Sequence, residues 1–433
     1  MSDENSVDAT LERLQHESFN YFLHETSPAN GLVLDKNEAN WPVSIAATGL
    51  ALAAYPVAVE RGFMPRLAAG RRTLNTLRFF GNSPQGPEPD ATGYKGFYYH
   101  FLDAQSGRRI WQCELSTVDS AFLLAGALTA GIIYFDAETA DEHEIRTLAD
   151  ALYRRADWQW AQNLGATVTH GWKPESGFLK SRWEGYDEAL LLYMLGLGSP
   201  THPLPESSYA AWASTYRWEQ CYGQDYLYAG PLFTHQLSHV RIDFRSIQDS
   251  FMRGKGIDYF ENSRRATYVQ QQYAIDNPLK FAGYAACCFG ITASEGPGPD
   301  IIIADGAERQ FLDYAGCGVP YGPDDGTLAP WALVASLPFA PEIVLPAIDH
   351  CIHKAKLTKL NPYGFKASFN QTHPGVPGNP YGWWVSPWHY GLNQGPIVLM
   401  IENYRSGFLW RLMRNCPYIA RGLRLAGFAG GWL

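Results

Sequence analysis

The stretch from Trp111 to Gly126 reads WQCELSTVDSAFLLAG and joins an acidic entrance to an apolar segment. Its second half is rich in Ala and Leu, which predicts a buried helix. Ser116 or Thr117 is placed to cap that helix, and Glu114 and Asp119 lie on either side of the cap. Two interpretations stay open from this stretch alone. The acids either complete a helix cap or line a pocket at the mouth of the helix.

The composition narrows the class of protein. Of the 433 residues, 46% are apolar, 18% are charged and 14% are aromatic. Many rings beside little charge suit the recognition of sugars, whose C–H faces stack on flat rings, although rings also fill the core of a helical barrel. The net charge of −9 at pH 7 argues against nucleic acid or an anionic membrane surface as a partner.

The cysteines and the N-terminus bear on the compartment. Seven scattered cysteines lack the spacing of a zinc site, which predicts buried free thiols under reducing conditions. No run of about 18 uninterrupted apolar residues occurs, so we expect no membrane span. The N-terminus is acidic and amphipathic, without the apolar core of a signal peptide. We expect a cytoplasmic protein or, if the chain was cut from a longer one, a periplasmic protein or an excised domain.

Predicted helices alternate with long aromatic loops along the whole chain. Apolar spacing predicts further helices over 8–22, 45–59, 65–80, 142–162, 209–219, 244–272, 329–337, 342–355 and 396–413. Asp187 and Glu188 form a second acidic entrance, just before the apolar run ALLLYMLGLG. Because no low-complexity block or flexible linker divides the chain, we expect one all-α domain over residues 1–433. An α/α toroid with a central pocket lined by loops at one end accounts for this pattern.

Several blocks are long enough to compare with known families. They read WPVSIAATGLALAAYPVAVERG from Trp41, GYKGFYYHFLD from Gly93, CELSTVDSAFLLAG from Cys113, WEGYDEALLLYMLGLGSPTHP from Trp183 and GLNQGPIVLMIENYRSGFLWRLM from Gly391. In these blocks the chain resembles the glycoamylase-like family, which is similar to bacterial β-1,2-glucanases and to the catalytic domains of cyclic β-1,2-glucan synthases. The resemblance covers almost the whole sequence. It implies an (α/α)6 barrel that acts on a β-glucan or gluco-oligosaccharide substrate.

Glu114 and Glu188 are the predicted catalytic pair. Cleavage of a glycosidic bond needs an acid that protonates the leaving oxygen and a second carboxylate that acts as base or nucleophile. Each glutamate lies at the entrance of an apolar helix, so in a toroid both point to the same end. Neighbouring rings such as Trp111 or Tyr186 would raise the pKa of one of them. The alternative for each is a carboxylate that merely begins a helix.

The remaining candidates come from the same blocks and loops. We expect substrate contacts from Asp35, Tyr94, Lys95, Asp103, Asp119, Trp183, Tyr186, Asp325, Trp384, Asn393 and Gln394. His235 and His239 have the i, i+4 spacing of metal ligands, but no third ligand is evident, so we expect neither a metal nor another cofactor. The sequence leaves the oligomeric state open.

Asn393 separates two reaction outcomes. In the resembling family, many members that hydrolyse glucan show Asp before Gln-Gly-Pro, where this chain has Asn393. An amide cannot deprotonate water, so an inverting hydrolase would need another carboxylate, Asp325 being one candidate. Hydrolysis of β-1,2-glucan or its oligosaccharides is the main prediction. The alternatives are a retaining β-1,2-glucan transglycosylase and a non-catalytic glucan-binding protein.

Overall fold

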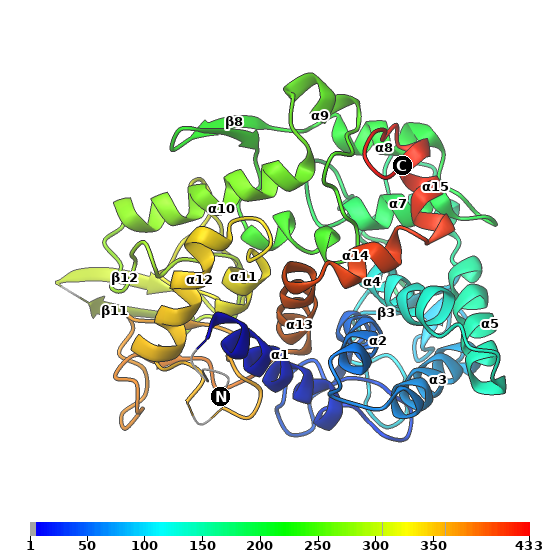
Figure 1. The fold of residues 1–433 in the computed structure, drawn as a ribbon, viewed down its shortest axis with the longest axis horizontal. Coiled ribbons are helices and arrows are strands. Elements are labelled where there is room, and N and C mark those ends of the chain that lie inside the picture. Colours follow the sequence, from blue (N-terminus) through cyan, green and yellow to red (C-terminus); the bar gives the residue numbers. More distant parts are fainter. Residues whose placement is uncertain (1–5, 305, 360) are drawn as a thin grey trace.

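Helices from every part of the chain surround a common centre in this computed structural model, which describes residues 6–304, 306–359 and 361–433. Figure 1 shows α13 near the middle of the view. The longer helices are α1 (Val7–His24), α2 (Ile45–Glu60), α3 (Arg66–Asn82), α4 (Thr117–Ala127), α5 (Ala140–Arg155), α7 (Leu190–Gly198), α10 (Tyr259–Asp276), α12 (Pro341–Asp349), α13 (Gly391–Arg405) and α15 (Pro417–Leu425). The shorter ones are α6 (Trp158–Gln162), α8 (Glu206–Ala213), α9 (Ser250–Lys255), α11 (Pro330–Ala335) and α14 (Phe408–Met413).

Short antiparallel strands occupy the loops, so the expectation of an all-α chain is corrected to a mainly helical one. One sheet runs in the order β2 (Gly93–Tyr94), β3 (Phe97–Tyr99), β5 (Leu115–Ser116), β6 (Gly171–Lys173) and β7 (Gly177–Phe178). The two-stranded pairs are β1 (Val43–Ser44) with β4 (Phe101–Leu102), β8 (Trp218–Cys221) with β9 (Gln224–Leu227), β10 (Ala293–Ser294) with β13 (Ala315–Gly316), β11 (Asp300–Ala304) with β12 (Ala307–Phe311), and β14 (Phe369–Asn370) with β15 (Trp384–Val385). Most are too short to show an alternating pattern, so the sequence gives no periodic signal for them.

The central helices are apolar on all sides and therefore buried. Every residue of α7 is buried, as is every residue of α4 except Asp119. Close backbone contact joins α2 to α4, where a Cβ on Gly126 would lie 2.0 Å from the carbonyl oxygen of Gly49. Only glycine fits at that crossing, so the two helices pack with almost no space between their backbones.

The stretch Thr117–Tyr134 consists of α4 and the π-helical segment η1 (Leu128–Tyr134), and it is long and apolar enough to cross a membrane. In the structure 83% of it is buried inside the molecule. A core helix has the same length and composition, so this stretch is weak evidence for a membrane span.

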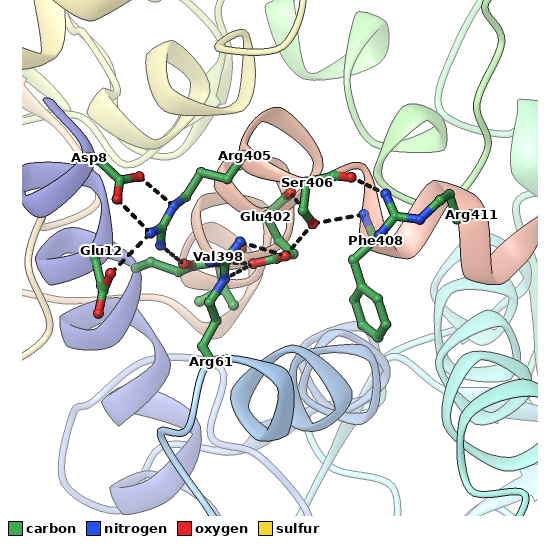
Figure 2. A network of polar contacts seen from close by, with 10 residues as sticks. Asp8, Glu12, Arg61, Val398, Glu402, Arg405, Ser406, Phe408 and Arg411 are labelled. Carbon is green, nitrogen blue, oxygen red and sulfur yellow. Dashed lines mark hydrogen bonds and ion pairs between the residues drawn. The ribbon is translucent and has the colours of Figure 1, made fainter.

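A polar network holds α13 against α1 and α2 (Figure 2). Glu402 of α13 is buried and accepts hydrogen bonds from the Arg61 guanidinium, with Nε–Oε2 at 2.6 Å and Nη2–Oε1 at 2.9 Å. Gln15 of α1 donates to the same carboxylate at 3.1 Å, and Ser406 donates at 2.5 Å. Arg405 pairs with two acids on α1. These contacts fix the position of α13, whose first turn lies beside the cavity described next.

Candidate active site

A cavity of about 300 Å³ contains both predicted catalytic acids in its lining. Glu114 directly precedes β5, and Glu188 lies two residues before α7. The first turns of α4, α11 and α13 complete much of the wall. The N-terminal ends of helices carry partial positive charge, which favours carboxylates at this end of the molecule. The two acidic entrances of the sequence therefore lie in one cavity.

His100 lies between two of the carboxylates. The pairing of β3 with β5 places His100 beside Glu114, with Nδ1 2.9 Å from Oε1, and its Nε2 is 3.6 Å from Oδ2 of Asp119. Burial disfavours the imidazolium, but the charges of Asp119 and Glu114 outweigh burial and raise the pKa of His100 to about 9. A protonated His100 thus donates to Glu114 and faces Asp119 at neutral pH.

The same contact determines the state of Glu114. Burial acts to raise the pKa of Glu114, whereas the hydrogen bond and charge of His100 lower it, and the balance lies below the usual value. Glu114 is therefore ionised at neutral pH, which suits a base or nucleophile rather than an acid.

Glu188 has the opposite tendency. Burial, together with the charge of Asp187, raises the pKa of Glu188 well above its usual value. Burial also raises the pKa of Asp187, but its Oδ1 accepts hydrogen bonds from the Ala189 amide and the Trp212 indole, both at 3.0 Å. In the described part of the chain no other residue hydrogen-bonds to the Glu188 carboxyl group. Of this close pair, Asp187 is stabilised as the anion and Glu188 keeps the proton.

The two interpretations of the stretch Trp111–Gly126, a helix cap and a pocket lining, each hold for some of its residues. Ser116 caps α4 by accepting from the Asp119 amide at 3.3 Å, and its hydroxyl donates to the Asp119 carboxylate at 2.5 Å. Glu114 takes no part in the cap. Asp119 nevertheless lines the cavity, so one residue serves both the helix start and the cavity wall.

Some of the predicted substrate contacts lie at the cavity and others close to it. Trp183 lines the wall, but its indole donates to Thr117 at 3.0 Å and one ring face stacks on His170. Asp35 accepts from the Trp41 indole at 3.1 Å, and burial raises its pKa to about 6.

Three further candidates stand behind or beside the wall. Tyr186 is buried with its ring against His235. Asn393 follows Leu392, a lining residue, in the first turn of α13. Gln394 is fully buried and donates to the Phe365 carbonyl at 2.8 Å.

Asp325 and Asp103 lie outside the cavity lining of the described residues. The Asp325 carboxylate accepts from the backbone amides of Leu312 at 2.8 Å and Thr327 at 3.0 Å. The Asp325 carboxylate therefore orders a loop. The Asp103 carboxylate accepts from the Ser106 amide at 2.7 Å and closes a turn.

Tyr94, Lys95 and Trp384 also lie outside the cavity lining of the described residues. Tyr94 packs against Trp160, with ring centroids 5.4 Å apart, and Lys95 pairs with Asp157 at 3.6 Å. Both contacts anchor the five-stranded sheet to the helices behind it. Trp384 belongs to β15, in the pair that β14 completes.

Three residues at or beside the cavity of the predicted catalytic pair were missed from the sequence. They are His100, Tyr314 and Glu295. His100 stands in the quoted block GYKGFYYHFLD, where a histidine among aromatic residues was the available signal. Glu295 and Tyr314 stand in segments without a recognisable pattern. Glu295 accepts hydrogen bonds from Ser386 and, at 3.3 Å, from Tyr390.

The two histidines with metal spacing are structural. In the described residues no group of three or more His, Cys, Asp and Glu side chains is arranged to hold a metal ion. His235 and His239 are buried, and burial lowers their pKa values to about 4 and about 3. Both are therefore neutral, and Ser263 bonds to the His235 carbonyl and to the His239 ring.

An acid with a raised pKa and an ionised carboxylate in one cavity of a helical fold are features of glycoside hydrolases. The chain belongs to the glycoamylase family, whose model, described as "Putative glucoamylase", matches residues 180–417. An exo β-1,2-glucooligosaccharide sophorohydrolase (non-reducing end) of Parabacteroides distasonis is 27% identical over 98% of this chain. This chain spans 58% of that relative's length.

Solved structures give the same relationship. A Bacteroides uniformis protein with the family's description is 30% identical, with a TM-score of 0.86 and 99% of each chain covered. The endo-β-1,2-glucanase of Chitinophaga pinensis, in complex with sophorotriose and glucose, is 25% identical. It has a TM-score of 0.86, and the match covers 99% of this chain and all of that one. The resemblance seen in the sequence blocks is confirmed.

Proposed function

We propose that this protein is a glycoside hydrolase that cleaves β-1,2-glucan or β-1,2-gluco-oligosaccharides within an (α/α)6 barrel. The names of its relatives support the substrate class, since two of them act on β-1,2-linked glucose chains. Because the chain spans 58% of the sophorohydrolase, the exo or endo character of that relative is not carried over.

One observation carries the proposal: the cavity holds two carboxyl groups with pKa values shifted in opposite directions. Burial raises the pKa of Glu188, while His100 lowers that of Glu114. Such separation assigns an acid and a base or nucleophile in glycosidases. Glu188 is the proposed general acid, which protonates the leaving glycosidic oxygen. Glu114 is the proposed partner carboxylate, and Asp119 holds His100 from its other side.

The test uses Glu188→Gln and Glu114→Gln, which keep the shape of the side chains and remove the acid function or the charge. Turnover of linear β-1,2-glucan should fall by about 10²–10⁴-fold, the usual contribution of general acid–base catalysis. Glu184→Gln is the matched control, since this glutamate lies in the same block and its side chain is exposed. A fully active Glu188→Gln enzyme would remove Glu188 from the mechanism. A parent protein that binds β-1,2-glucan without cleaving it would favour the non-catalytic alternative.

The same assay decides between hydrolysis and transfer. Asn393 favours the retaining transglycosylase as the second candidate, because the position has no carboxylate to activate water. Inverting enzymes place their carboxyl groups about 6.5–9.5 Å apart and retaining enzymes about 5–5.5 Å. NMR of the first-formed anomer, with linear and cyclic β-1,2-glucan as substrates, reports the outcome. Shorter, inverted products support the hydrolase, whereas retained, elongated or cyclised products support the transglycosylase.

A further inference from the structure

Tyr314 is a large side chain of the cavity for which the described residues provide no bonding partner. We propose that Tyr314 binds the glucosyl unit that lies beside Glu188, with its ring stacked on the sugar and its hydroxyl donating to a sugar oxygen. This inference rests on the proposed function, because it names a contact to the proposed substrate.

The pairing of β10 with β13 places Tyr314 on the cavity. Ala293 pairs with Gly316 and Ser294 with Ala315, so continuing the register brings Glu295 opposite Tyr314. Directly opposed residues of an antiparallel pair point to the same face, and alternate residues share a face. Ala293 and Tyr314 both line the cavity, which agrees with this register. Tyr314 therefore stands on a wall that carries neither Glu114 nor Glu188.

Tyr314 differs from Trp183, a predicted substrate contact in the same cavity, because its ring and hydroxyl are not bonded to protein groups. In the described part of the chain, neither a hydrogen bond nor a ring pair nor a cation contact involves Tyr314, and 58% of its side chain is exposed. Trp183 is only 8% exposed, its N–H is bonded to Thr117, and His170 covers one of its ring faces. A ring that lines a cavity without packing on protein has both a face and a hydroxyl available for a ligand.

The charges around Tyr314 make its hydroxyl a donor. Desolvation by the surrounding cavity walls and the ionised acids nearby raise the pKa of Tyr314, so the phenol stays neutral across the physiological range. The acids that contribute are Asp35, Asp119 and Glu295, and also Glu188 whenever it is ionised. Tyr314 thus shares the cavity with the proposed acid Glu188 and with Asp119. A sugar hydroxyl placed there can accept from Tyr314 and donate to a carboxylate.

The chain context indicates that Tyr314 affects binding rather than proton transfer. The segment that carries it includes the β11–β12 hairpin, which projects at the left edge of Figure 1. Glu114 and Glu188 are held by β5 and α7, so a change at Tyr314 leaves their supports intact. Loss of the Tyr314 hydroxyl should therefore raise KM while the pH profile, set by the catalytic carboxyl groups, stays unchanged.

The experiment compares Tyr314→Phe and Tyr314→Ala with the parent enzyme on linear β-1,2-gluco-oligosaccharides. The Phe variant keeps the ring and removes the donor, so kcat/KM should fall by about 2- to 10-fold, the equivalent of one neutral hydrogen bond. The Ala variant also removes the ring, so its kcat/KM should fall at least about tenfold. Tyr321→Phe is the matched control, since Tyr321 is 59% exposed and lies outside the cavity lining, and its kcat/KM should not change.

The outcomes separate this inference from the proposed function. An active parent whose Phe and Ala variants both stay within twofold in kcat/KM overturns the role of Tyr314 and leaves the proposed function standing. A loss in kcat alone with a shifted pH profile overturns the binding role, because it would make Tyr314 a proton-transfer group. A parent that turns over no β-1,2-glucan overturns the proposed function and this inference with it. Calorimetry in the Glu188→Gln background should show weaker oligosaccharide binding when Tyr314→Phe is added.

Discussion

At the scale of single residues, His100 decides which acid of the cavity keeps a proton. Its pKa of about 9 means that an imidazolium lies between Glu114 and Asp119 at neutral pH. A cation beside a carboxylate favours the ionised form, which makes Glu114 an unsuitable proton donor. Glu188 has no such neighbour within hydrogen-bonding distance in the described residues. The assignment of acid and partner thus follows from the position of one histidine.

The variant His100→Gln tests this assignment. It removes the charge that lowers the pKa of Glu114, so that pKa should rise. Activity requires ionised Glu114, so on acidification the variant should lose activity at a higher pH than the parent does. At pH 6 its kcat/KM should be about tenfold or more below that of the parent. His202→Gln, at an exposed histidine, is the control. The full pH profile of kcat/KM is the measurement, and an unshifted acid limb would contradict the role given to His100.

Local sequence patterns could reveal only part of this site. Glu114, Asp119 and Glu188 were found because they begin apolar helices, which is visible within a few residues. His100 and Tyr314 reach the cavity only through strand pairing between distant segments, for which two- or three-residue strands leave no periodic signal. Asp325 had the same composition cues as a site acid, but nearby backbone amides take up its carboxylate.

At the scale of elements, apolar spacing located most of the helices but not their breaks; it missed α15 and extended α8 into β8. The predicted helix over 244–272 consists of α9 and α10, separated at Gly256, whose φ is 71°. The predicted helix over 396–413 begins earlier, at Gly391, and is divided into α13 and α14 at Gly407, whose φ is 66°. A residue in the left-handed backbone conformation ends a helix even where the apolar pattern continues. Glycine adopts this conformation at little cost in free energy.

The network around Glu402 is expected to stabilise the packing of α13. Glu402→Gln removes the charge that balances Arg61, so the free energy of unfolding should decrease by about 2–3 kcal/mol. Burial acts to raise the pKa of Glu402, but the hydrogen bond and charge of Arg61 outweigh burial, so this pKa lies below its usual value. The stabilisation is therefore present above the ordinary pKa of a glutamate and is lost as pH falls through the lowered one. Denaturant unfolding at pH 7 and at acidic pH measures both effects.

Glu12→Gln is the control for this network. The Glu12 side chain is 53% exposed and pairs with Arg405, so its replacement should change the free energy of unfolding by no more than about 0.5–1 kcal/mol. If Glu402→Gln and Glu12→Gln lowered the free energy of unfolding equally, burial of the Glu402 charge would not contribute to stability.

At the scale of the whole molecule, the first and the last helix of the chain are packed into the same core. One hydrophobic cluster extends from Leu11 in α1 to Phe428 beyond α15. Near the C-terminus, a Cβ on Gly422 of α15 would lie 2.0 Å from the Met194 carbonyl oxygen of α7. Neither α1 nor α15 can detach without exposing buried apolar surface, which costs a free energy of about 25 cal/mol per Å². This packing supports the prediction that residues 1–433 form one domain.

If that prediction holds, thermal unfolding should be a single transition in which far-UV circular dichroism and tryptophan fluorescence coincide. A ligand that binds only the folded state should shift the whole transition. For Glu188→Gln at 100 times the dissociation constant of a β-1,2-gluco-oligosaccharide, the stabilisation is about 2.7 kcal/mol. For a chain of 433 residues this corresponds to a rise in Tm of about 3 °C. Two separate transitions, of which the ligand moves only one, would show that the site belongs to one of two domains.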